Sequence, residues 1–204
     1  MTDTGQTDHW RHQGPMPQRG GPHFADLVEQ LRRVQDGFVG ARLPSETGAV
    51  VLEQLSDIAD TLAAHQVAPL DAPAGARLDL PGRGHPFLPP HVVDEWTETR
   101  VRAHVTFARY HLGGNGAATG GAHAVLFNEI LGRLSAGGGR PLSRTAYVHV
   151  NYRSVTPIGR RLAIEATLDR IDGRKRFVSG RLLDGTVTVA DAEGLFVELL
   201  PGQP

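Results

Sequence analysis

The residues best suited to chemistry lie in one apolar segment near the middle of the chain. The segment begins with Thr119-Gly120-Gly121, and Asn128-Glu129 follows seven residues after the second glycine. The first amides of a helix have no intrahelical acceptor and carry the positive end of the helix dipole. Because glycine has no side chain, a ligand can approach the backbone closely there. Gly120 and Gly121 are therefore candidates for polarising a carbonyl group, and tight packing against a second chain explains them equally well.

Four other polar residues of this segment each allow two interpretations. Asn128 has no basic atom at neutral pH, but its amide can hydrogen-bond a water or a carbonyl oxygen. Glu129 is a candidate general base or a polar contact at the helix edge, since its side chain points about 100° away from that of Asn128. His123 is a candidate base or a packed residue with a local hydrogen bond. Thr119 can donate its hydroxyl to a ligand, but we expect it to cap the helix.

These residues need a helix and a sheet to position them. The segment from Thr119 to Gly132 is apolar nearly all round, which predicts a helix buried on most of its surface, and three glycines follow as a stop. Alternating apolar and polar residues predict five strands, near residues 97–107, 146–153, 162–169, 175–183 and 186–200. Asp172-Gly173 and Asp184-Gly185 predict tight hairpins, so these strands must be antiparallel. The sequence predicts an α+β domain over residues 94–204, with a long central helix wrapped by a curved antiparallel sheet.

The N-terminal part differs in composition. Residues 1–22 are polar, and we expect a disordered tail. Residues 23–93 form an N-terminal extension, with two amphipathic helical stripes between residues 24 and 64 and a Pro/Gly-rich covering loop over residues 65–93. We expect both stripes to pack on the domain that follows.

Composition excludes several classes of function. The 204 residues are 40% hydrophobic and 21% charged with a net charge of −1, so no basic field favours nucleic acid or a membrane surface as partner. There is no cysteine, which excludes disulfides and thiolate chemistry. No histidine pair has zinc-ligand spacing, and the glycine-rich loop 113–116 lacks the Gly-Lys-Ser/Thr ending of a phosphate-binding loop. Neither a membrane span nor a signal peptide is evident, so we expect a cytoplasmic protein.

The order of several short motifs carries a resemblance. The motifs are Thr119-Gly120-Gly121, Leu126-Phe127-Asn128-Glu129, Thr145-Ala146, Asn151-Tyr152-Arg153, Thr156-Pro157, Gly173-Arg174-Lys175 and Asp191-Ala192-Glu193-Gly194-Leu195-Phe196. Together they resemble hotdog-fold acyl-CoA thioesterases, nearest to the PaaI-like and THEM-type group, over about residues 97–200. The resemblance implies the hotdog fold and hydrolysis of an acyl-CoA thioester to the free acid and CoA without a cofactor. The strongly apolar helix and the open edges of a single curved sheet predict assembly as a homodimer or tetramer.

The same resemblance assigns roles to residues of this chain. The family has histidine at the position of Thr119 and aspartate at the position of Asn128, where this chain carries neither. Thr145 aligns with a threonine that helps to position the attacking water, or it is simply a β-branched strand residue. An alternative function follows from Asn128: a non-catalytic acyl-CoA-binding hotdog protein that has lost the catalytic acid. A hotdog-fold hydratase is disfavoured because no Asp-x4-His pair precedes the helix.

Basic residues near strand ends are candidates for the phosphates of CoA. They are Arg153, Arg160, Arg161, Arg174, Lys175 and Arg176. We expect Arg153, Arg174 and Lys175, together with the backbone of Gly120, to bind the ligand, because guanidinium groups pair well with phosphate. The alternative for each is a solvated hairpin charge.

Overall fold

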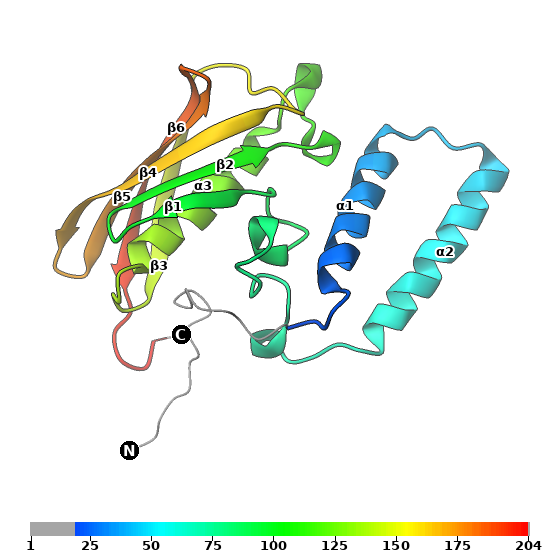
Figure 1. Ribbon diagram of the computed structural model, residues 1–204, viewed down its shortest axis with the longest axis horizontal. Helices are drawn as coiled ribbons and strands as arrows, with labels where there is room; N and C mark the ends of the chain where they lie inside the picture. The colour runs from blue at the N-terminus through cyan, green and yellow to red at the C-terminus, as the bar shows by residue number, and fades with distance from the viewer. Residues whose placement is uncertain (1–18, 204) are drawn as a thin grey trace.

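The computed structural model describes residues 19–203 and contains the expected helix wrapped by a sheet (Figure 1). The central helix is α3 (Gly120–Ala136). The strands are β1 (Val92–Trp96), β2 (Arg100–Thr106), β3 (Ser143–Tyr152), β4 (Arg161–Asp172), β5 (Lys175–Asp184) and β6 (Val187–Glu198). They form one six-stranded antiparallel sheet in the order β1-β2-β4-β5-β6-β3. The predicted fold class is confirmed.

Strand alternation creates the core. On β2 and β4, every second side chain is buried against α3, while the intervening side chains lie on the outer face. The helix contributes Leu126, Phe127, Ile130, Leu131 and Leu134 to the same core, and all five are fully buried. A helix that is buried on this many sides is apolar all round in its sequence, and this pattern predicts that the helix lies inside the sheet.

A glycine on β5 lets the helix lie close to the sheet. A Cβ at Gly180 would lie 3.1 Å from the Leu131 side chain and 3.4 Å from that of Phe127. The two hairpins also depend on glycine, because Gly173 and Gly185 have φ values of 55° and 61°. Each glycine opens a two-residue turn, as in a type II′ hairpin, so the predicted hairpins are confirmed.

Strand β1 was not predicted. It lies at the boundary between the Pro/Gly-rich loop and the predicted domain, and its pairing with β2 is interrupted by an irregularity between Val93 and Glu95. A five-residue strand that follows two prolines and contains two adjacent acids shows no clear alternation, so its pattern does not distinguish it from loop.

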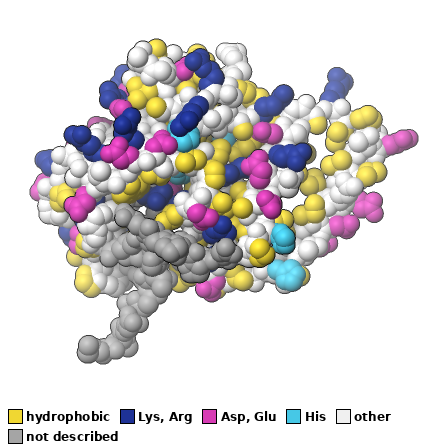
Figure 2. Space-filling view, in the orientation of Figure 1, with side chains coloured by type: hydrophobic (Ala, Val, Ile, Leu, Met, Phe, Trp, Pro, Cys, Tyr) yellow, Lys and Arg dark blue, Asp and Glu magenta, His cyan; other side chains and the backbone are white. Residues whose placement is uncertain are grey.

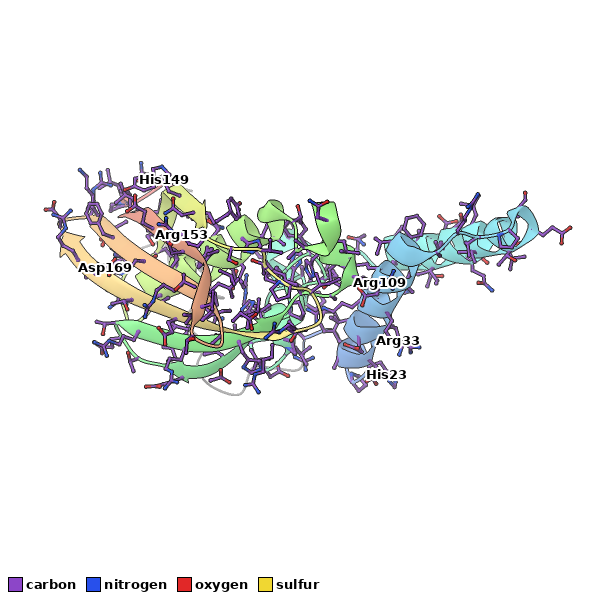
Figure 3. The ribbon with its side chains drawn as sticks, turned by 90° about the horizontal axis from the view of Figure 1, so that it is seen from above. His23, Arg33, Arg109, His149, Arg153 and Asp169 are labelled. Atoms are coloured by element: carbon purple, nitrogen blue, oxygen red, sulfur yellow. The ribbon has the colours of Figure 1, made fainter. Side chains whose placement is uncertain are left out.

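The N-terminal extension contains α1 (Phe24–Gly40) and α2 (Ser45–Ala63). Helix α1 buries Val28 and Arg32, and its Asp36 carboxylate accepts the Tyr110 amide hydrogen at 3.0 Å. Helix α2 buries no residue, and it projects away from the sheet in both views (Figures 1 and 3). The expectation that both stripes pack on the following domain is therefore wrong for α2. It holds for little of α1, where Val28 is buried but Leu27, Leu31 and Val34 are exposed. The apolar residues of α2 are largely exposed, as Leu52 is at 68%. Figure 2 shows hydrophobic side chains, in yellow, on the surface of the helical extension.

Most of the predicted tail, residues 1–18, lies outside the described residues. Within the remainder, Arg19 donates a hydrogen bond to the Leu70 carbonyl at 3.0 Å, and its own carbonyl accepts one from Arg77. None of the described helices is both long enough and apolar enough to cross a membrane.

Candidate active site

The start of α3 presents one open glycine and one covered glycine. A Cβ at Gly121 would meet no atom within 4 Å, so its backbone faces open space. A Cβ at Gly120 would lie 2.9 Å from the Tyr152 hydroxyl oxygen, which donates a hydrogen bond to the Gly120 carbonyl, also at 2.9 Å. Gly120 is thus packed against Tyr152 of its own chain, so packing against a second chain stays a prediction, and the ligand-approach explanation fits Gly121.

Thr119 occupies the N-cap position of α3 but makes no side-chain capping hydrogen bond. Its amide donates to the His111 carbonyl at 2.8 Å, and its carbonyl accepts from the Ala122 amide at 3.1 Å. The expected capping role is therefore wrong: the backbone of Thr119 shapes the helix start, and its exposed side chain lies beside the glycine amides. Those amides lack intrahelical acceptors and can donate to an incoming oxygen.

Asn128 and Thr145 form a pair two turns further along α3. The Thr145 hydroxyl donates to the Asn128 side-chain oxygen at 3.0 Å, and both residues are exposed. Because the Asn128 oxygen accepts this bond, its NH₂ group is directed elsewhere and can donate to a water or a carbonyl oxygen. Both residues are site candidates in the sequence analysis, and in the structure their side chains are in contact.

Glu129 is not part of this pair. It is 5% exposed and lies in a buried ion pair with Arg83, whose Nη2 donates to its Oε2 at 2.8 Å. Arg133, one turn later, lies 3.9 Å from the same carboxylate. This geometry supports the interpretation of Glu129 as a structural contact at the helix edge, and it gives no support to a role as general base.

His123 is also held in a local contact. It is 1% exposed, with its Nδ1 3.0 Å from the Thr119 carbonyl and its Nε2 2.8 Å from the Thr156 hydroxyl. Burial lowers the pKa of His123, so the ring stays neutral at physiological pH. The structure supports the interpretation of His123 as a packed residue.

The two halves of the candidate site are separated within one chain. Gly121 and Asn128 are seven residues apart on a straight helix, a rise of about 10 Å, which is too far for both to contact one carbonyl group. Strand β3 spans the same distance: Tyr152 at one end touches Gly120, and Thr145 near the other end touches Asn128. Since β3 is an edge strand, its outer edge is open to pairing.

The predicted phosphate-binding residues do not form one cluster within the chain. Arg153 follows β3 near the start of α3 and pairs with Asp191, while Arg174 and Lys175 lie at the β4–β5 turn, where Arg174 donates to the Glu198 carbonyl at 3.0 Å. Figure 3 shows Arg153 on the sheet part of the molecule, away from the helical extension. Two further candidates, Arg160 and Arg161, pair with the acids Asp184 and Asp94. Arg176 is buried at 2% exposure and is therefore not a ligand residue.

Sequence reasoning missed three residues around the site: Arg83, Tyr152 and Thr156. Tyr152 lies in a motif that carries the resemblance, but nothing in the sequence shows that its hydroxyl reaches Gly120, 32 positions away. Arg83 lies between two glycines in a segment that reads only as a turn. Among the described residues, no three histidine, aspartate or glutamate side chains are arranged to hold a metal ion.

The chain was compared with protein families and with known proteins. No family model matches the chain. The acyl-coenzyme A thioesterase THEM4 of Bos taurus is 34% identical over 94 residues, which are 45% of this chain and 38% of that protein. This chain thus spans well under two thirds of the curated relative's length.

Solved structures extend the comparison to a larger part of the chain. A thioesterase superfamily protein of 26% identity superposes with a TM-score of 0.75 over 89% of this chain and 97% of its own. A hypothetical thioesterase of Streptococcus pneumoniae TIGR4, solved with coenzyme A, is 16% identical with a TM-score of 0.50 over 52% of this chain and 86% of its own. The wider coverage of the first match means that it includes much of the N-terminal extension.

The fold is therefore the hotdog fold of the thioesterase superfamily, as the motifs of the sequence predicted. The sequence match to the THEM4 acyl-CoA thioesterase covers less than half of either chain, so assignment to the PaaI-like or THEM-type group stays a prediction.

Proposed function

We propose that this protein hydrolyses an acyl-CoA thioester to the free acid and CoA. The observation that carries the proposal is the open backbone at Gly121 at the start of a buried helix, combined with the Asn128–Thr145 pair on the same helix. The helix-start amides would stabilise the negative charge that develops on the thioester oxygen during attack. The amide of Asn128, held by Thr145, would orient the attacking water.

The complete site would form between two chains. If β3 pairs antiparallel with β3 of a second copy around a two-fold axis, the Thr145 end of one strand lies beside the Tyr152 end of the other. Because Tyr152 contacts Gly120, this pairing brings the glycine amides of one protomer toward the Asn128–Thr145 pair of its partner. It would also bring Arg153 of one protomer toward the end of the partner sheet that carries Arg174 and Lys175.

We therefore predict a homodimer or a multiple of it. Light scattering on the purified protein should give about twice the 21.9 kDa mass of one chain, or four times in the tetramer. A proline at Val150, near the C-terminal end of β3, should shift the mass toward the monomer because it removes a ladder donor from the pairing edge. A monomer in the unmodified protein would contradict the assembly.

A second candidate function is acyl-CoA binding without hydrolysis. It is favoured by the absence of an available base among the described residues of the site: Asn128 is an amide, Glu129 is locked to Arg83, and His123 is buried. General-base catalysis typically contributes about 10²–10⁴-fold, so hydrolysis by this arrangement would be slow.

One experiment separates the two functions. Thiol release is measured across a panel of acyl-CoAs of increasing chain length, and calorimetry measures the binding of the same compounds at low temperature. Thiol release that depends on protein concentration supports the hydrolase. Binding without thiol release supports the binding protein. If no acyl-CoA of the panel is bound or hydrolysed, both functions are excluded.

Gly121→Ala provides a sharper test of the site. The new methyl group would contact nothing in the protein, and alanine is about 0.5–1 kcal/mol more favourable than glycine within a helix, so stability should be unchanged or higher. The methyl group would nevertheless occupy the open face beside the amides, and a substrate displacement of ~1 Å can cost about 10²-fold in rate. A variant with wild-type activity would show that the thioester does not lie against Gly121.

A further inference from the structure

We propose that Arg83 is a positioning residue, which sets the orientation of Asn128 through its ion pair with Glu129. The inference rests on the proposed function, since Asn128 matters most if it orients water. It adds a role for the covering loop, which otherwise reads only as a connection between the helical extension and the sheet.

The contact between Arg83 and Glu129 has two points of attachment. The Arg83 Nε lies 2.6 Å from Oε1 of Glu129, and its Nη2 donates to Oε2 at 2.8 Å. Both side chains are about nine-tenths buried or more. Of the two contacts, the one from Nη2 to Oε2 has hydrogen-bond geometry, and the one from Nε to Oε1 is a close approach of opposite charges. Separating two charges that are buried together is strongly unfavourable, so the pair resists movement of either side chain. Glu129 therefore cannot rotate about the helix axis without breaking a buried ion pair.

The backbone of Arg83 is in a conformation that few side chains adopt. Its φ is 56° and its ψ is 30°, and it lies between Gly82 and Gly84, which also have positive φ values. A non-glycine residue in the left-handed region costs of order 1 kcal/mol or more and persists only where the surroundings enforce it. Here the guanidinium Nη1 donates to the Gly75 carbonyl, and the Gly75 amide donates back to the Arg83 carbonyl at 3.0 Å.

The segment that carries Arg83 is itself fastened to neighbouring elements. Arg32 of α1 donates to the Pro81 carbonyl at 2.9 Å, and the Gly82 amide donates to the His91 carbonyl at 2.8 Å. The loop is thus held at α1 on one side and next to the start of β1 on the other. It can serve as a fixed support for the middle of α3.

Helix α3 needs such a support because its packing is mostly apolar. The hydrophobic effect is not directional, so the exact orientation of the helix depends on close packing in the core together with directional polar contacts at its edges. Directional contacts at the two ends come from His123, which meets Thr156, and from Ser135, whose carbonyl accepts from Arg176. In the middle turn, the Glu129–Arg83 pair lies directly beside Asn128. Rotation there would move Asn128 away from Thr145.

The test compares three variants at a temperature where circular dichroism shows each to be fully folded. Arg83→Lys keeps the positive charge but removes the planar guanidinium group with its several donors, and Glu129→Gln removes the negative charge of the carboxylate. Glu198→Gln is the matched control, because Glu198 pairs with the buried Arg176 at the far end of α3. We expect kcat to fall about 10–10²-fold in the first two variants, with the dissociation constant for acyl-CoA unchanged. The control should lower the melting temperature and leave kcat unchanged.

Each alternative result has a defined meaning. Wild-type kcat in Arg83→Lys and Glu129→Gln, or an equal fall in Glu198→Gln, would overturn the positioning role. Activity abolished in Glu129→Gln but unaltered in Arg83→Lys would identify Glu129 as a base and also overturn it. If the wild type releases no thiol, the proposed function fails, and the side-chain amide resonance of Asn128 becomes the readout. A shift of that resonance in Arg83→Lys, absent in Glu198→Gln, supports positioning, and no shift contradicts it.

Discussion

Replacement of Asn128 by aspartate should raise the rate of thiol release from acyl-CoA by about 10²–10⁴-fold, the usual range for a positioned general base. The substitution replaces the NH₂ group of the side-chain amide by an oxygen and keeps the shape of the side chain. The Thr145 hydroxyl, which now donates to the amide oxygen of Asn128, would donate to the carboxylate instead. The other carboxylate oxygen would then be available to accept a proton from water. Steady-state kcat with a short and a long acyl-CoA measures the gain.

The control for this gain is Asn115→Asp. Asn115 is an exposed asparagine with a φ of 56° in the loop before α3, a conformation that aspartate also tolerates. It adds the same charge near the start of the helix without reaching the Thr145 hydroxyl, so kcat should not rise. A lower kcat in Asn128→Asp would show that the amide belongs to a different arrangement, one that takes its base from elsewhere. If both variants bind acyl-CoA as the wild type does and neither releases thiol, the result would favour acyl-CoA binding without hydrolysis as the function.

Much of the fold could be predicted because its determinants are local. The alternation in β2 and β4, the apolar α3 and the glycines at the two hairpin turns are each visible within about a dozen residues. Burial on one face of a strand or on most faces of a helix leaves a periodic trace in the sequence. Strand β1 lacks that trace, since it is short and irregular, and its existence depends on the neighbouring β2.

The candidate site was only partly predictable for the opposite reason. The resemblance to the thioesterases identified the glycines and the Asn128 position on one helix, but their partners come from distant segments. Arg83 reaches Glu129 across 46 positions, and no pattern near either residue indicates the contact. Sequence reasoning therefore left the role of Glu129 open, and the long-range ion pair is what favours a structural role.

Helix α2 shows a second limit of sequence patterns. Its stripe correctly predicted an amphipathic helix, but an apolar face does not specify the surface that it contacts. In the structure that face is exposed, as Leu52 and Ile58 illustrate with exposures of 68% and 54%. The periodicity of α1 is of the same kind, yet α1 packs near Tyr110 and α2 does not pack on the domain.

Arg176→Ala should lower the free energy of unfolding by about 1–3 kcal/mol, the usual cost of leaving buried polar groups without their hydrogen-bond partner. Arg176 is 2% exposed, and its Nη2 donates to Oε2 of Glu198 at 2.7 Å. Its Nη1 also donates to the carbonyls of Ser135 and Pro141, at 3.0 and 2.7 Å, which join the end of α3 to the loop before β3. Alanine would leave the Pro141 carbonyl and the Glu198 carboxylate without this donor and would also leave a cavity. The Ser135 carbonyl would keep its hydrogen bond from Arg140, at 3.1 Å.

Urea denaturation followed by circular dichroism measures this loss, with Arg181→Ala as the matched control. Arg181 lies on the same strand and donates to Glu165 at 2.7 Å, but its side chain is 60% exposed. Because exposed ion pairs contribute about 0–1 kcal/mol, its removal should change the unfolding free energy by no more than that. Equal losses in the two variants would mean that burial does not determine the strength of these pairs. A loss below about 1 kcal/mol in Arg176→Ala would mean that water or other donors replace the guanidinium at the end of α3.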